Sequence, residues 1–81
     1  MSLYNDKALN IVINLHRKGI RWEVIGSILR GQDPKVLGRF FFCFALRNLM
    51  RNEFRLSERS IRVAFESMCV PEDVLVRVLS A

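Results

Sequence analysis

The sequence predicts an all-α fold, a compact bundle of four or five short helices in a single helical domain spanning residues 1–81. Apolar residues recur three and four positions apart along most of the chain, and no segment alternates as a strand does. The two prolines and four glycines fall mostly where such helices should begin or end. An apolar fraction of 51% excludes intrinsic disorder, which requires low hydrophobicity.

The first helix is expected to begin at Asn5 or Asp6, with Asn5 as its N-cap, and to end at Gly19. Its inward face is the apolar stripe Ala8, Ile11, Val12 and Leu15. The second helix is expected from Arg21 to Arg30, with Gly31 ending it. Its apolar face consists of Val24, Ile25, Ile28 and Leu29.

The third helix is predicted to run without a break from Pro34 to about Asn52, because Asp33-Pro34 is a strong N-cap and N1 pair. Gly38 is its weak point, costing about 1 kcal/mol against alanine if exposed. Ser57 is the predicted N-cap of a fourth helix, and Pro71 begins a fifth. The apolar positions of these two helices are Ile61, Ala64, Phe65, Met68, Val74, Leu75, Val78 and Leu79.

Short spacers at residues 19–20 and 69–70 predict an αα-hairpin at each end of the chain, flanking a central Phe-rich helix. The two hairpins match faintly at an offset of fifty residues, pairing for example Ile11 with Ile61 and Ile20 with Val70. Shared helical periodicity explains such a match, and a pseudo-symmetric bundle is the sharper interpretation. Both interpretations predict similar packing.

A row of residues four apart gives the third helix a possible basic edge. The row consists of Lys35, Arg39, Cys43, Arg47, Arg51 and Arg55. With a net charge of +5 and a pI of about 10.0, the chain favours polyanions such as nucleic acid, an anionic membrane surface or an acidic protein. The alternative is that the edge is simply the solvated side of a core helix.

The segment from Trp22 to Asp33 also fits a helix-turn-helix, with Gly31-Gln32-Asp33 as the turn and a recognition helix from Pro34. Gln32, Lys35 and Arg39 then offer phosphate or guanine contacts. The spacing of Trp22, Ile25, Gly26, Leu29 and Gly31 resembles that of the Myb/SANT type of DNA-binding domain. That resemblance implies DNA binding, but it covers only residues 22–31, and Gln32 stands where the family usually has arginine.

Apolar side chains supply the competing hypothesis. Four phenylalanines, Phe40, Phe41, Phe42 and Phe44, point in nearly all directions around one helix, so a small bundle can leave one side, including Phe40, Phe41 and Phe44, as a dimer seam or partner groove. Trp22 would extend such a patch. A fully enclosed core helix is the alternative.

No catalytic or metal-ligand pattern stands out, and no cofactor is expected. His16, the one histidine, has no cysteine or paired acid at the spacing of a catalytic triad or a metal site. We expect it to lie in the last turn of the first helix, where a cation interacts favourably with the helix dipole. Cys43 and Cys69 fit no disulfide framework; we expect both to be reduced and partly buried, which favours a cytoplasmic or nuclear location. The N-terminus does not look like a signal peptide, and the run Phe40–Leu46 is too short to span a membrane.

The sequence therefore predicts a small, non-enzymatic regulatory module without a small-molecule substrate. The leading hypothesis is nucleic-acid binding as a homodimer, through Gln32, Lys35, Arg39, Arg47, Arg51 and Arg55. The alternative is a protein–protein adaptor or anti-activator that masks an acidic or apolar partner through its Phe-rich surface.

Overall fold

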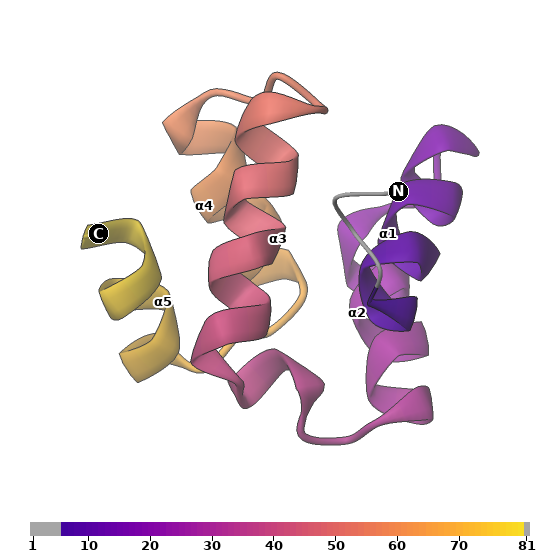
Figure 1. Cartoon of the computed structure of the whole chain (residues 1–81), viewed down its shortest axis with the longest axis horizontal. Helices are drawn as coiled ribbons and strands as arrows, with labels where there is room; N and C mark the ends of the chain where they lie inside the picture. The colour runs from indigo at the N-terminus through magenta and orange to yellow at the C-terminus, as the bar shows by residue number, and fades with distance from the viewer. Residues whose placement is uncertain (1–5, 81) are drawn as a thin grey trace.

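The computed structural model describes residues 6–80, and within that range it contains five α-helices, one short 3₁₀ turn and no strand. The all-α prediction is confirmed. The elements in chain order are α1 (Lys7–Arg17), α2 (Trp22–Gln32), η1 (Val36–Gly38), α3 (Phe40–Asn52), α4 (Glu58–Ser67) and α5 (Glu72–Ser80). In Figure 1, α3 stands between the α1–α2 pair and α5, and the segment containing η1 joins α2 to α3 along one edge.

The first hairpin, α1–α2, turns through a Schellman motif at Gly19. The N–H of Gly19 donates to the carbonyl of His16 at 2.9 Å, and the N–H of Ile20 donates to the carbonyl of Leu15 at 3.1 Å. Gly19 has a φ of +77°, a conformation that glycine adopts without strain. The predicted helix stop at Gly19 is therefore confirmed.

The second hairpin, α4–α5, turns through the same motif fifty residues later. Cys69 donates to the carbonyl of Glu66 at 3.0 Å, and Val70 donates to the carbonyl of Phe65 at 3.1 Å. Cys69 has a φ of +64°, which a side chain with a Cβ adopts only at a cost. The sequence match at this offset thus corresponds to two hairpins with the same local turn.

The predicted unbroken helix from Pro34 to Asn52 is wrong, because α3 begins only at Phe40. The side chain of Asp33 accepts from the N–H of Lys35 at 3.1 Å, so it closes a local turn instead of capping a helix. Arg39 is extended, with φ −87° and ψ 119°. The intervening turn buries both Val36 and Leu37 and ends at Gly38, a poor helix former.

The helix boundaries differ from the predictions at two further points. The N-cap of α1 is Asp6, whose Oδ1 accepts from the N–H of Ala8 at 2.7 Å, while Asn5, the predicted cap, lies outside the described residues. The second helix runs through Gly31 to Gln32. The predicted cap of the fourth helix is confirmed, since the Ser57 hydroxyl accepts from the N–H of Ser60 at 3.1 Å.

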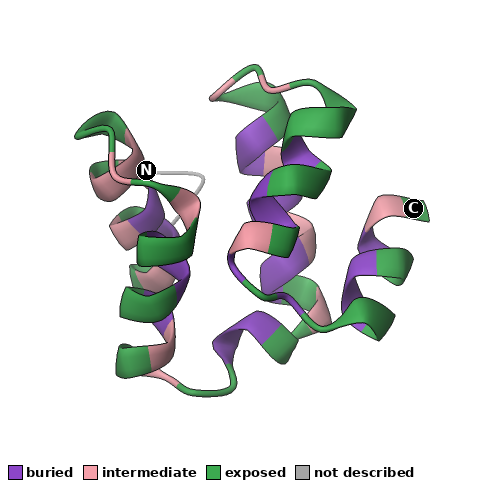
Figure 2. Cartoon of the chain, turned by 180° about the vertical axis from the view of Figure 1, so that it is seen from behind, coloured by how far each residue is buried: buried purple, intermediate pink, exposed green. Residues whose placement is uncertain are grey.

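The buried side chains of all the helices meet in one core, as the inward-facing purple segments in Figure 2 show. Its fully buried large members include Ile25, Leu29, Leu46, Leu49, Met50, Ile61, Phe65, Met68 and Leu75. The helices α2 and α4 pack closely where they meet, because a Cβ on Gly26 would lie 2.9 Å from the Cα of Met68. The side of α3 opposite Phe41 faces this core, which fixes where its phenylalanines point.

Candidate interaction surface

The predicted basic edge does not exist as one exposed row. Lys35 lies before η1, Arg39 precedes α3, and Arg55 follows α3 with a φ of +59°. Cys43 and Arg47, in the middle of the row, are buried. The break at Arg39 changes the register of the chain, so residues four apart in sequence no longer share one face.

Arg47 is a core residue, with 5% of its surface exposed. Its guanidinium carbon lies 4.7 Å from the ring centre of Phe44, and its Nη1 donates to the carbonyl of Val78 at 2.9 Å. These contacts bind α3 to α5. Arg51, one turn further on, forms an ion pair with Glu58 at the start of α4. Neither arginine therefore presents the free guanidinium that the sequence analysis expected.

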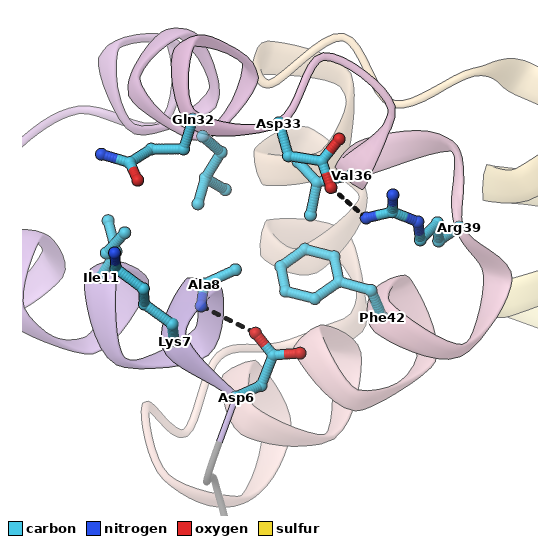
Figure 3. A pocket seen from close by; sticks show the side chains of 10 residues that line it. Asp6, Lys7, Ala8, Ile11, Gln32, Asp33, Val36, Arg39 and Phe42 are labelled. Atoms are coloured by element: carbon cyan, nitrogen blue, oxygen red, sulfur yellow. Dashed lines mark hydrogen bonds and ion pairs between the residues drawn. The ribbon is translucent and has the colours of Figure 1, made fainter.

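Gln32 and Arg39 both line a hollow of about 400 Å³ beside α1, and Figure 3 shows them on opposite sides of it. Arg39 forms an ion pair with Asp33, and the ring of Phe42 points into the hollow. The side-chain hydrogen bond from Arg39, with the backbone one from Lys35, lowers the pKa of Asp33. The lining mixes both charges, since Asp6 and Lys7 also belong to it.

The α-helix predicted to begin at Pro34, directly after the turn, begins only at Phe40. The segment 33–39, with η1 inside it, separates α2 from α3, so the three-residue turn Gly31-Gln32-Asp33 is wrong. The first turn of α3 presents phenylalanines where a recognition helix needs polar side chains. In the stretch that resembles the Myb/SANT type, Ile25, Gly26 and Leu29 are buried.

The most exposed aromatic surface in the described chain lies at the start of α3. We call Phe40, Phe41 and Phe44 the Phe patch. Phe41 is 85% exposed, whereas Phe40 and Phe44 are partly buried. The ring of Phe40 lies edge-on to that of Phe41 at 5.6 Å and tilted against that of Phe44 at 5.9 Å, so the three rings form one cluster.

An apolar groove of about 600 Å³ adjoins the Phe patch. The groove is formed by the beginnings of α1 and α3, and its lining residues are Asp6, Leu9, Arg39, Phe40, Phe41, Phe42 and Ala45. A volume of this size falls in the range of pockets that bind small ligands. The exposed rings therefore border a concave surface.

Arg77 of α5 adds a positive charge to this surface. Its guanidinium carbon lies 4.5 Å from the ring centre of Phe40, a cation–π arrangement. Arg77 is exposed and makes no ion pair with an acid among the described residues, although Asp73 lies one turn before it. Helical periodicity does not predict this contact, because it joins residues 37 positions apart on separate helices.

Trp22, which the sequence analysis assigned to the same interface, lies in a different cluster. Its ring stacks on His16 at 4.9 Å, and His16 stacks on Phe54 at 4.1 Å. Burial lowers the pKa of His16 from its ordinary value of 6.5. This cluster joins the end of α1 to the start of α2 and to the chain following α3.

The cysteines are free, but the expectation that both are partly buried is wrong. Cys43 is fully buried, and Cys69 is exposed. The Cys43 thiol donates to the carbonyl of Leu37 at 3.2 Å, and burial raises its pKa to about 12. A neutral, enclosed thiol of this kind packs as an apolar side chain.

Among residues 6–80, no group of three or more potential ligands is placed to hold a metal ion, and no helix is long and apolar enough to cross a membrane. Comparisons of the chain with protein-family models, with curated proteins and with solved structures found no match. The functional assignment therefore depends on the surface itself.

Proposed function

We propose that this chain is a non-enzymatic protein-interaction module whose contact surface is the Phe patch. The observation that carries the proposal is the 85% exposure of Phe41 beside two further rings and an apolar groove. Single exposed apolar residues are ordinary, whereas a cluster of aromatic rings beside a concave apolar surface is typical of interaction sites. Aromatic side chains are also frequent among the residues that dominate binding energy.

The alternative sites support binding less well. Of the six residues predicted to contact nucleic acid, Arg47 is buried, and Arg39 and Arg51 are paired with acids. The exposed cations Lys35 and Arg55 are separated by both η1 and α3, since Lys35 precedes η1 and Arg55 follows α3. Binding driven by phosphate contacts needs several cations on one surface, so the geometry favours a protein partner.

Site-specific photo-crosslinking tests the proposal. A benzoylphenylalanine in place of Phe41 should form a defined adduct with a protein in the cells that express this chain. The same group in place of Val63, which is 53% exposed on α4, should not form that adduct. Equal adducts from both positions, or none from position 41, would contradict the proposal. An adduct of two copies of the chain would identify the predicted homodimer.

A further inference from the structure

The charges around the Phe patch indicate which kind of partner it accepts. From them we infer that the patch binds an acidic amphipathic helix, with an apolar side chain in the groove beside Phe41 and a carboxylate on Arg77. This inference rests on the proposed function and adds the chemistry of the partner.

The apolar part of the contact follows from the rings and the groove. Phe41 stands at the edge of the groove, with Leu9 and Ala45 among the other lining residues. Because Phe40 and Phe44 are held by Arg77 and Arg47, respectively, the rings are positioned before a partner arrives. A surface that is already ordered loses less conformational entropy on binding.

The position of Arg77 is the reason to expect a carboxylate on the partner. Its guanidinium stacks on Phe40 and remains exposed, so its edge is available to an incoming acid. Of the other charged groups near the patch, Arg39 is paired with Asp33, Arg47 is buried against α5, and Asp6, the N-cap of α1, also lines the groove. Asp73, on the same helix, makes no ion pair with Arg77.

A second copy of this chain fits the charges less well. In a twofold contact the same surface lies on both sides, so the Arg77 of each copy would face a patch that already carries an Arg77. The two positive charges would repel, and neither arginine would gain a carboxylate. A helix fits better than an extended strand, because residues 6–80 contain no sheet edge to which a strand could be added. An amphipathic helix instead brings apolar side chains spaced three and four apart, with acids along the border.

Designed peptides test this inference. The probe is a labelled peptide of about sixteen residues with leucines at helical spacing and glutamates elsewhere, long enough to form a helix when bound. One matched peptide replaces its glutamates with lysines, and another replaces its leucines with serines. Fluorescence anisotropy gives the affinity, and amide chemical shifts of the labelled protein locate the contact.

The Leu/Glu peptide should bind and shift residues 39–45 and Arg77, whereas both matched peptides should bind at least about tenfold more weakly. Phe41→Ser should weaken the Leu/Glu peptide about tenfold or more, and Arg77→Gln about threefold to fivefold. The controls Val63→Ser and Arg59→Gln, on the exposed surface of α4, should leave its affinity within about twofold.

Equal binding of the lysine peptide, shifts that map away from the patch, or an affinity that does not depend on Arg77 would each overturn the inference. A dimer in sedimentation that Phe41→Ser dissociates would also overturn it, by making a second copy the occupant. If the Leu/Glu peptide fails while crosslinking from position 41 succeeds, only the partner chemistry is wrong. If the crosslink from position 41 also fails, the proposed function is wrong as well.

Discussion

The α1–α2 and α4–α5 hairpins share one local turn but bury different faces. At equivalent positions, Val74 and Val78 of α5 are 7% and 0% exposed, whereas Val24 and Ile28 of α2 are both 37% exposed. The two hairpins differ because their second helices have different neighbours. Helix α5 packs against α3, whereas α2 packs against α4 through Gly26. Local sequence therefore defines the hairpin, and the neighbouring helix decides which apolar residues reach the core.

The largest expected effect comes from the pair Phe65 and Leu15, which occupy equivalent positions. Phe65 is fully buried, so Phe65→Ala should reduce the free energy of unfolding by about 3–5 kcal/mol. Leu15 is partly buried, and Leu15→Ala should cost only about 1–2 kcal/mol. Urea denaturation followed by circular dichroism measures both.

Because a small protein has little stability to lose, a milder substitution at the same position complements Phe65→Ala. Phe65→Leu removes less volume and should cost about 1–2 kcal/mol, whereas its matched partner Leu15→Val, at a partly buried position, should cost about 0.5 kcal/mol or less. Equal losses at positions 15 and 65 under matched substitutions would show that the two hairpins are buried alike.

The next largest change in the free energy of unfolding concerns the contact of Gly26 in α2 with Met68 at the end of α4. A side chain at Gly26 collides with the backbone of Met68, so Gly26→Val should destabilise the protein by about 2–3 kcal/mol. Gly31 has open space around its Cβ position, and Gly31→Ala should instead stabilise α2 by up to about 1 kcal/mol. A tolerated valine at position 26 would contradict the close approach of α2 and α4.

The sequence predicted those features that depend on local chemistry. The helical periodicity, the stop at Gly19 and the cap at Ser57 each involve residues within a few positions of one another. The break at Arg39 was missed, because Asp33 and Pro34 suit either a helix start or a tight turn, and burial of Val36 and Leu37 decides between them.

The candidate site was only partly predictable for the same reason. Phe40, Phe41 and Phe44 were identified from composition, but their exposure depends on where α3 begins and what covers it. The single basic row depends on an unbroken helix from Pro34, and the structure interrupts that helix at Arg39. Arg77 joins the patch through a contact between separate helices, which periodicity does not reveal.

A smaller effect compares the two turns themselves. Cys69 adopts the left-handed conformation that Gly19 adopts freely, so Cys69→Gly should stabilise the protein by about 0.5–1 kcal/mol and Gly19→Ala should destabilise it by about 1 kcal/mol. Cys69→Ala removes the sulfur but keeps the strain, and it should leave stability nearly unchanged. Thermal denaturation of the three variants measures these differences, and stabilisation by alanine as large as that by glycine would argue against backbone strain.

The smallest effect comes from the protonation of His16, a histidine that only the first hairpin contains. His16 stacks on both Trp22 and Phe54, whose ring centres are themselves 6.3 Å apart, whereas the equivalent Glu66 is exposed beside Arg62. Burial lowers the pKa of His16 in the folded protein, so the unfolded chain binds its proton more readily. The stability that neutral His16 contributes is therefore fully present above the ordinary pKa of 6.5, and it is lost as the pH falls from there toward the lower pKa of the folded protein.

Because the His16 ring is partly exposed, we expect the free energy of unfolding to fall by less than about 1 kcal/mol between pH values of about 7.5 and about 5.5. The free energy of unfolding at both pH values should show this loss for the wild type and for Glu66→Gln, but not for His16→Gln. An identical pH dependence in His16→Gln would assign the titration to another group.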